Sequence, residues 1–457
     1  MRVVVIGSFG SSGDQHYRVH QPAAALAALP GMEVFEVHPA ARDRDVAALA
    51  ADLLVLTMTL DLEAFRLIRQ RRLLGRPTVV EVNDYLPDVQ AWNPAATSWR
   101  DPRGISLFHG LIRAGDACQF SSHGLAERLQ QHARTAVVFP NHLDAIPPFD
   151  RLKHNSDALP LRIGWGGSIG HLEDLNSVAP TLCHWLASQS NVRLEIMADS
   201  SVAAIVKSLA GDRAQIRTPG SLKQYRHWLN SLHIGLAPLL PTEYNRCRSD
   251  VKFLEYAAAG AAAVLQDETP YRSLGASGLA SLFDSTEAMV EQLNHLIHNP
   301  QQRLEQAHRA HAHVSATREI HAAVVERREF YAAVQAHNSS IPGPLPSLLE
   351  QQRGIELTEI PGWERISEHH WRMDLCSSAD QQYTQGLEAM QSGNWSAAEQ
   401  RFQASIRSDA NHAPSHTFLA LCQEKQGRTQ QAIQSFRTAQ RLDPLALRPR
   451  RGLERPY

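Results

Sequence analysis

Residues 249–267 read SDVKFLEYAAAGAAAVLQD, and this pattern predicts a short helix followed by a buried strand. Ser249 is placed to cap the helix, because its hydroxyl can accept a hydrogen bond from a free backbone N–H. Asp250 suits the positive end of the helix dipole, and Gly260 suits the left-handed position that ends a helix. The small apolar residues after Gly260 favour a strand that is buried on both faces.

Lys252 and Glu255 are three residues apart and share a helix face that lies away from the apolar stripe. A helix N-terminus that carries a serine and a lysine is a ready phosphate site, and a carboxylate one turn later can hold sugar hydroxyls. The alternative is an ion pair on a solvated helix face, and this stretch considered alone favours the ion pair.

The longer run SDVKFLEYAAAGAAAVLQDETPY resembles the donor-binding motif of retaining glycosyltransferases with the GT-B fold, the group 1 or family 4 class. In that family a Lys-x-x-Glu helix faces the nucleotide sugar and its glutamate binds the ribose, a position that Glu255 occupies here. The family often has another glutamate eight residues earlier, where this chain has Cys247. The resemblance implies an α/β fold in which two Rossmann-like, doubly wound domains face a cleft.

Length and composition set wider bounds. With 457 residues we expect two or three domains, and a hydrophobic fraction of 43% with 20% charged residues is typical of a globular protein. A net charge of −2 gives no electrostatic case for nucleic acid or for an anionic membrane. The five cysteines are scattered without a CxxC pair, which argues for a reducing compartment and against a structural zinc site. No apolar run is long enough for a membrane span or a signal peptide, so we expect a cytoplasmic protein.

The first domain, residues 1–152, opens with the apolar run Val3–Ile6 and a glycine loop that ends at Gly13. Strand, glycine loop and helix are typical of a doubly wound α/β domain, with the loop at the carboxyl edge where ligands bind. The glycine spacing differs from the dinucleotide GxGxxG pattern, so we expect no nicotinamide or flavin site. Further strands are predicted at Glu33–Val37, Leu53–Thr57, Thr78–Val82, Ala117–Ser121 and Ala136–Phe139.

Two features of this domain suggest an acceptor site. Arg18 follows the glycine loop and is the kind of donor that clamps a carboxylate or a phosphate. Asn83 and Asp84 end the fourth strand, where the resembled family often has a histidine that faces the reaction centre. Asp84 could equally be a turn or cap residue ahead of Tyr85. The expected acceptor-binding residues are Gly10, Ser11, Gly13, Arg18 and Asp84.

Asp43-Arg44-Asp45 has the DxD spacing that binds a divalent ion in the other major glycosyltransferase fold. These residues lie in a charged, helix-initiating stretch and do not follow an apolar strand. We therefore interpret them as a solvated helix start and expect no metal and no other cofactor.

The second domain, residues 153–338, follows a polar, proline-ended hinge and repeats the pattern of strand, glycine loop and helix from Leu161 onward. Backbone N–H groups of Gly166, Gly167 and Ser168 could cradle a diphosphate. His171 could be a functional donor or an ordinary helix-start residue. Further strands are predicted at Leu194–Ala198 and Ile234–Pro238, and the last helix before residue 338 is expected to cross back onto the first domain.

The resembled family commonly places arginine and lysine after this second glycine loop, and this chain does not. We therefore expect Lys252, Arg248 or Arg246 to meet the phosphate charge, and backbone atoms of residues 219–221 to hold the base. The expected donor-binding residues are Gly166, Gly167, Ser168, His171, Arg248, Ser249, Asp250, Lys252 and Glu255.

Residues 339–376 show little periodicity and are interpreted as a linker anchored by Trp363 and Trp371. Residues 377–457 contain a repeat of 34 residues, in which Leu387 corresponds to Leu421 and Phe402 to Phe436. This pattern matches the tetratricopeptide repeat. Two such units are seldom stable alone. We therefore expect them to pack on the catalytic body or on a second chain, or to be completed by the tail. They could dock a protein or peptide partner, or serve as a capping or dimerisation element.

The first hypothesis for function is a retaining, metal-independent glycosyltransferase. It would move a sugar from a nucleoside-diphosphate donor to a glycan, lipid or protein acceptor. Asp84, Lys252 and Glu255 would be its catalytic residues, and preorganised donors would stabilise the leaving-group charge. The alternative is a degenerate GT-B fold that acts as a non-catalytic carbohydrate-binding or repeat-scaffold protein. Cys247 and the missing basic residues after Gly167 motivate this alternative.

Overall fold

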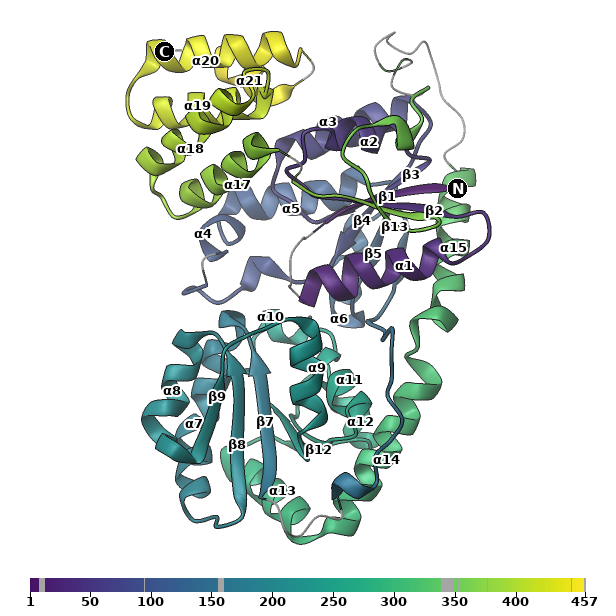
Figure 1. Ribbon diagram of the computed structural model, residues 1–457, viewed down its shortest axis with the longest axis vertical. Coiled ribbons are helices and arrows are strands. Elements are labelled where there is room, and N and C mark those ends of the chain that lie inside the picture. The colour runs from purple at the N-terminus through teal and green to yellow at the C-terminus, as the bar shows by residue number, and fades with distance from the viewer. Residues whose placement is uncertain are drawn as a thin grey trace.

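The computed structural model describes residues 1–7, 13–93, 95–154, 160–337, 349, 351, 354–375, 377–444 and 446–455. Two α/β lobes, each built on a parallel sheet, lie one above the other, and a helical segment follows them (Figure 1). Among the described residues no helix combines the length and the apolar character needed to cross a bilayer.

The first lobe contains an eight-stranded sheet with the order β13-β14-β2-β1-β3-β4-β5-β6. Its strands are β1 (Arg2–Ile6), β2 (Glu33–Val37), β3 (Leu53–Thr57), β4 (Thr78–Val82), β5 (Ala117–Phe120), β6 (Ala136–Val138), β13 (Glu364–Ser367) and β14 (His370–Met373). The helical elements before the second lobe are η1 (Gln15–His20), α1 (Gln21–Ala27), α2 (Arg44–Ala50), α3 (Leu62–Leu73), η2 (Leu86–Asp88), α4 (Ala96–Trp99), α5 (Pro102–Ala114), α6 (His123–Leu129), η3 (Gln130–His132) and η4 (Leu152–His154). The predicted strands at 33–37, 53–57 and 78–82 are confirmed with the same bounds, and those near 117 and 136 are each one residue shorter.

The second lobe contains a six-stranded parallel sheet with the order β12-β11-β10-β7-β8-β9. Its strands are β7 (Leu161–Gly167), β8 (Val192–Ala198), β9 (Ala214–Arg217), β10 (Ile234–Ala237), β11 (Ala262–Gln266) and β12 (Ser281–Phe283). Its helical elements are η5 (Ile169–His171), α7 (Leu172–Ala187), α8 (Ser200–Ala210), η6 (Gly211–Arg213), α9 (Leu222–Asn230), α10 (Glu243–Arg246), α11 (Val251–Ala258), α12 (Arg272–Ala276), α13 (Thr286–His298) and α14 (Pro300–Thr317). The short edge strands β9 and β12 were not predicted, because neither has a clear apolar run.

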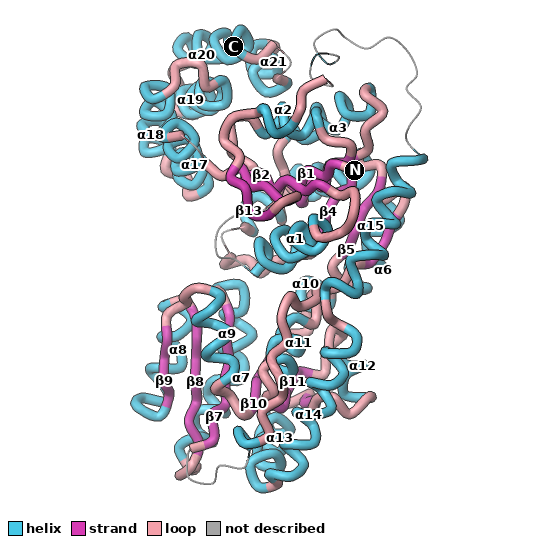
Figure 2. The backbone as a smooth tube through the Cα atoms, turned by 45° about the vertical axis from the view of Figure 1, so that its right-hand side comes forward, coloured by secondary structure: helices cyan, strands magenta, loops and turns pink. Residues whose placement is uncertain are grey.

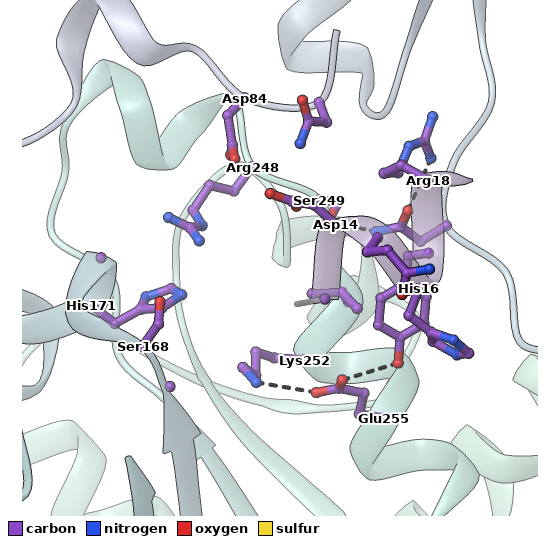
Figure 3. Close-up of a pocket in the computed structure, with 18 of the residues that line it drawn as sticks. Asp14, His16, Arg18, Asp84, Ser168, His171, Arg248, Ser249, Lys252 and Glu255 are labelled. Carbon is purple, nitrogen blue, oxygen red and sulfur yellow. Dashed lines mark hydrogen bonds and ion pairs between the residues drawn. The ribbon is translucent and has the colours of Figure 1, made fainter. Parts of the chain in front are cut away.

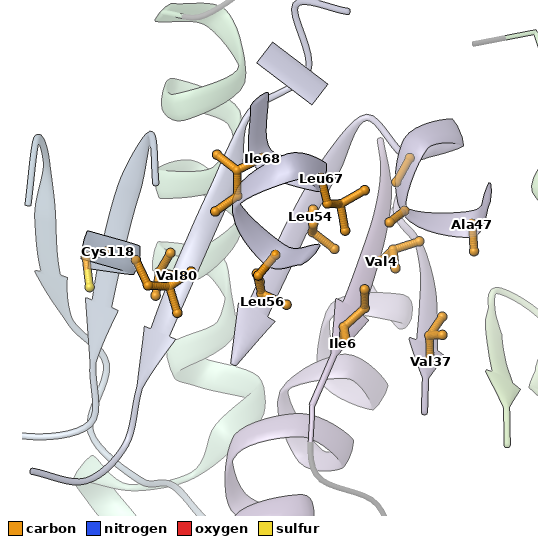
Figure 4. Packing of buried hydrophobic residues seen from close by; sticks show 14 of the residues in the cluster. Val4, Ile6, Val37, Ala47, Leu54, Leu56, Leu67, Ile68, Val80 and Cys118 are labelled. Carbon is orange, nitrogen blue, oxygen red and sulfur yellow. The ribbon is translucent and has the colours of Figure 1, made fainter. Parts of the chain in front are cut away.

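The core of the first lobe lies on both faces of its sheet. Val4 and Ile6 of β1 pack with Leu54 and Leu56 of β3 on the face that α2 and α3 cover (Figure 4). The alternate residues of the same strands belong to a second apolar cluster with α1 and with α15 (Ile320–His337). Burial on both faces explains the continuous apolar runs in the sequence. The contacts of α15 in the second cluster also confirm the prediction that the last helix before residue 338 crosses back onto the first lobe.

The interpretation of residues 339–376 as a linker is wrong for the part that the structure describes. After the short turn η7 (Leu357–Glu359), strands β13 and β14 form a hairpin, and β14 pairs in parallel with β2. Trp371 stacks on Phe35 with ring centroids 4.7 Å apart, and Trp363 meets the same ring edge-on at 5.0 Å. The two tryptophans therefore anchor this segment, as expected, but they do so by extending the sheet.

The interpretation of Asp43–Asp45 as a helix start is confirmed, because α2 begins at Arg44 with Asp43 at its N-cap. The side chains are not simply solvated, however. Asp45 forms ion pairs with Arg44 and with Arg66 of α3, so arginines balance its charge.

The C-terminal segment forms two helical hairpins and a short tail helix. These are α17 (Ser378–Gln391), α18 (Trp395–Ser408), α19 (Ala413–Lys425), α20 (Thr429–Leu442) and α21 (Leu447–Leu453). Figure 2 shows them beside the first lobe, on the side away from the second lobe. Backbone N–H groups at the start of α21 donate to Glu63 of α3, and Arg448 forms an ion pair with Asp61. The tail therefore covers the last hairpin and fastens the repeats to the first lobe.

Candidate functional site

A cavity of about 850 Å³ lies between the two lobes, at the carboxyl ends of their parallel strands (Figure 3). It brings together the predicted site residues Gly13, Arg18, Asp84, Gly167, Ser168, His171, Arg248, Ser249, Lys252 and Glu255. Gly166 and Asp250 do not line it, and Gly10 and Ser11 lie outside the described residues. A shared crevice at this edge is where doubly wound sheets bind ligands.

Helix α11 presents its N-terminus to the cavity, but Ser249 does not cap it. The Ser249 hydroxyl instead accepts a hydrogen bond of 2.9 Å from the Asn141 side chain of the first lobe. The N-cap residue is Asp250, whose carboxylate makes no capping bond and pairs with Arg318. The prediction of a serine cap is therefore wrong, because partners distant in the sequence take both side chains. Gly260 has φ of +66°, which confirms the predicted left-handed end of the helix.

Lys252 and Glu255 do form the ion pair that the sequence suggested, but they lie in the wall of the cavity and not on an open helix face. The Lys252 Nζ is 3.1 Å from Glu255 Oε2, and the Glu255 side chain is only 7% exposed. Tyr17 of the first lobe donates to Glu255 Oε1 at 3.0 Å, and Tyr225 of α9 donates to Oε2 at 2.7 Å. Burial, together with Glu255, raises the pKa of both phenols well above the usual value, so both remain donors at neutral pH.

The second glycine loop contributes its later residues to the cavity. Gly167, Ser168 and His171 line it, whereas Gly166 does not. A Cβ on Gly166 would meet the rings of Trp228 and Tyr225, so this glycine gives those rings room to pack. Of the predicted base-holding residues 219–221, the first two line the cavity.

His171 forms a hydrogen-bonded pair with Asp174, a residue that was not predicted to belong to the site. His171 Nδ1 is 2.9 Å from Asp174 Oδ2, and the other oxygen of this buried carboxylate accepts from Leu240 N and Asn245 Nδ2. Burial opposes ionisation of Asp174, yet the hydrogen bond from His171 keeps the pKa of that carboxyl below its ordinary value. Burial, followed by the positive charge of Arg248, lowers the pKa of His171 to about 4. The imidazole is therefore neutral at pH 7, with Nδ1–H on Asp174 and the Nε2 lone pair available.

Arg248 places a second cation in the wall. Its guanidinium lies over the Tyr244 ring at 4.8 Å, and its buried Nη1 finds no hydrogen-bond partner among the described residues. Arg246, the other predicted candidate, is wrong for this role, because it is exposed and pairs with Glu243. Cys247 is buried in the apolar cluster of the first lobe and does not line the cavity. Cys247, at the position where the family often has a glutamate, therefore faces the first lobe and not the cavity.

Asp84 faces Arg248 from the first lobe (Figure 3). Burial raises the pKa of its carboxyl to about 7 against the attraction of Arg248, and the neighbouring Asp14 adds to the rise. A carboxyl that is half ionised at neutral pH can exchange a proton with a ligand. The alternative of a plain turn residue does not account for this half-buried, cavity-facing position.

Arg18 lies in the cavity wall, but most of its donors are used within the first lobe. Its Nε donates to Glu81 at 2.8 Å, and Nη1 donates to Phe139 O and to Asn141. Only Nη2 lacks a hydrogen-bond partner among the described residues. Arg18 could therefore offer one donor to a ligand, and its main role is to neutralise Glu81.

Several lining residues had no clear signal in the sequence. They are Asp14, His16, Tyr17, His20, Asp199, Tyr225, Arg372 and Asp374. Asp174, which does not line the cavity, had one usable signal, because a residue three positions after His171 in a helix lies on the same face. Arg372 and Asp374 could not be found, since the segment that carries them was interpreted as a linker.

Comparison with protein families gives two matches. Residues 184–324 match the family described as glycosyl transferase-like, and residues 383–446 match the tetratricopeptide repeat. No curated protein matches the chain.

Solved structures of low identity share the two-lobed fold. A sucrose-phosphate synthase from Thermosynechococcus elongatus is 13% identical, with a TM-score of 0.56 over 74% of this chain and 99% of its own. HepE from Anabaena in complex with UDP is 13% identical, with a TM-score of 0.53 over 73% of this chain and 99% of its own. The trehalose-6-phosphate structure from E. coli bound with UDP-2-fluoro glucose is 12% identical, with a TM-score of 0.51 over 73% and 99%.

These matches agree with the sheet topology and confirm the fold that the resemblance implied. Residues 184–324 are therefore a glycosyl transferase-like domain within a two-lobed, GT-B-like fold, and residues 383–446 are tetratricopeptide repeats.

Proposed function

We propose that the chain is a retaining glycosyltransferase that moves a sugar from a nucleoside-diphosphate donor to an acceptor hydroxyl, with no metal in the chemical step. The observation that carries the proposal is the shared cavity. Arg248, Lys252 and Glu255 line it from the second lobe, and Asp84 faces them from the first.

The donor would lie against the second lobe. Lys252, the unpartnered Nη1 of Arg248 and the N-terminus of α11 supply positive charge for a diphosphate. Pro219 and Gly220 would hold the base, and Glu255 would hold the ribose. Glu255 Oε1 accepts one hydrogen bond from Tyr17, so a lone pair on this oxygen is left for a ribose hydroxyl. Because Tyr17 belongs to the first lobe, the carboxylate that would hold the ribose also contacts that lobe.

The acceptor would lie against Asp84, Gly13 and Arg18. Its oxygen forms a bond to the anomeric carbon while the bond from that carbon to the diphosphate oxygen breaks. The hydroxyl proton passes to Asp84 or to the leaving diphosphate. The two cations stabilise the negative charge that develops on the leaving group. No protein nucleophile is required.

The rival function is a non-catalytic carbohydrate-binding or scaffold protein that works through its repeats. The observation in its favour is Cys247, which occupies the position of a family glutamate and is buried in the first lobe. In the first proposal, by contrast, the acceptor is a glycan, a lipid or a protein. The repeats would then dock a protein or peptide partner.

Calorimetry with a panel of UDP-, GDP- and ADP-sugars separates the two functions. We expect one donor class to bind, and we expect Lys252→Ala to weaken it by about 10- to 100-fold. This range corresponds to the ~1.5–3 kcal/mol of a hydrogen bond to a charged group. Lys223→Ala, which changes an exposed lysine on α9, should leave the affinity unchanged. Absence of binding by every donor would favour the scaffold function, and equal binding by the Lys252 variant would refute the role of this lysine.

A further inference from the structure

A second cluster of charged side chains lies at the edge of the first sheet, where β14 pairs with β2. His20 from the end of η1, Glu36 from β2 and His370 from β14 meet there. Glu36 and His370 are 0% and 1% exposed, and the two imidazoles stack with centroids 5.7 Å apart. One nitrogen of each histidine and an oxygen of Glu36 lie within 4.8 Å of one another.

Hydrogen bonds alone do not satisfy this cluster. His20 Nδ1 and His370 Nε2 are 2.8 Å and 2.6 Å from the same oxygen, Glu36 Oε1. Arg372 Nη2 is 2.9 Å from the same His20 Nδ1. If Nδ1 carries a proton, it donates to Glu36 and repels the guanidinium. If Nδ1 is bare, it accepts from Arg372 and turns its lone pair towards a carboxylate oxygen. Either protonation state leaves one close contact unfavourable.

A divalent cation removes this conflict. Two imidazole nitrogens and one carboxylate oxygen are the ligands that zinc takes in three-ligand protein sites, with a fourth position left for water. All three ligands would then be unprotonated at the metal, and their lone pairs would converge on one positive charge. We propose that His20, Glu36 and His370 bind a zinc-like divalent cation that fastens β14, and with it the repeat segment, to the edge of the first sheet. This proposal does not depend on the glycosyltransferase assignment.

Arg372 is the competitor for this cation. His370 and Arg372 are two residues apart on β14, so both point to the same face of the strand. The guanidinium holds His20 and lies 3.4 Å from Glu36 Oε2, where it supplies part of the charge that a metal would supply. His20 and Arg372 also line the cavity between the lobes, which gives an ion a path of entry and gives the displaced guanidinium room.

Neither the cysteine spacing nor the Asp43–Asp45 motif points to this cluster. Glu36 and His370 are 334 positions apart, so no local spacing reveals them. The cluster exists only because β14 returns to the first sheet after the second lobe.

The test is titration of the full-length protein with Co²⁺, followed by visible absorption, and with Zn²⁺, followed by calorimetry. We expect one site per chain, and we expect His370→Ala and Glu36→Gln to weaken binding by at least about 100-fold, the upper end of what outer-shell changes cost. His369→Ala is the matched control, because His369 is the adjacent residue and its side chain is 49% exposed. It should bind the metal like the unchanged protein.

The Arg372→Ala variant tests the same site by a gain of affinity. Removing the competing guanidinium should tighten Co²⁺ binding by about 10-fold, because two nearby positive charges repel. This variant keeps every ligand, so it remains informative if His370→Ala does not fold. The proposal is overturned if the triple variant His20→Ala, Glu36→Gln, His370→Ala binds as much metal as the unchanged protein. Unchanged or weaker binding by Arg372→Ala also overturns it.

Discussion

Replacing Asp84 by asparagine should lower kcat/KM for sugar transfer by about 100- to 10,000-fold, the range of general acid–base catalysis. Burial raises the pKa of Asp84 to about 7, so the fraction that can accept a proton grows as the pH rises through neutrality. The kcat/KM of the unchanged protein should therefore increase with pH and level off above about pH 8. The asparagine variant should lose this limb, because its amide does not titrate. The measurement is release of nucleoside diphosphate from a donor that binds, with water as acceptor where no other is known.

Asp212→Asn is the control, since Asp212 lies exposed in η6. It should keep both the rate and the pH profile. If the Asp84→Asn variant has the same pH profile as the unchanged protein, the leaving diphosphate takes the proton and Asp84 only shapes the cavity.

Glu81→Ala should reduce the free energy of unfolding of the first lobe by about 3–5 kcal/mol, the cost of removing one partner from a buried ion pair. The side chains of Arg18 and Glu81 are 3% and 1% exposed. Gln119 also donates to this carboxylate, so the truncation leaves the Nε of Arg18 and the amide nitrogen of Gln119 without this acceptor. The measurement is urea unfolding followed by hydrogen exchange of the β4 amides, which reports the free energy of unfolding of this lobe alone. A probe within one lobe is needed because a chain of several domains need not unfold in one step.

Glu33→Ala provides the comparison on the same sheet. Arg2 and Glu33 form an ion pair whose side chains are 34% and 36% exposed, and such pairs contribute about 0–1 kcal/mol. A loss for Glu81→Ala no larger than that for Glu33→Ala would contradict a stabilising role for the buried pair. Replacing both Arg18 and Glu81 by apolar residues of similar size should cost less than removing Glu81 alone.

Much of the fold could be predicted because its strands are long apolar runs bounded by clear turn residues. The runs at 33–37, 53–57 and 78–82 are each buried on both faces of the sheet, so their continuous apolar pattern predicts the strands directly. Strands β13 and β14 could not be predicted in this way. They lie in a polar segment and become ordered by pairing with β2 and by the stacking of Trp371 on Phe35. The local sequence pattern contains no information about a pairing partner so far away in the chain.

In the candidate site, too, some residues could be predicted from local sequence and others could not. Lys252 and His171 were found because each follows a recognisable strand, loop or helix start. The hydrogen bonds that Tyr17 and Tyr225 donate to Glu255 could not be foreseen, since these tyrosines lie 238 and 30 positions away from it. The same reason explains why Ser249 does not cap the helix and why Asp250 does not line the cavity. Both have side chains suited to a helix start, and both are bound by residues of other elements.

The late return of β14 to the first sheet also has a consequence for synthesis on the ribosome. Strand β2 emerges early, yet its outer edge stays unpaired until residue 373 has left the exit tunnel. Unpaired strand edges invite association between chains, and pairing over such a separation is slow. The nascent N-terminal lobe therefore passes through most of translation as an incomplete sheet, and chaperones that shield strand edges would act on it during this interval.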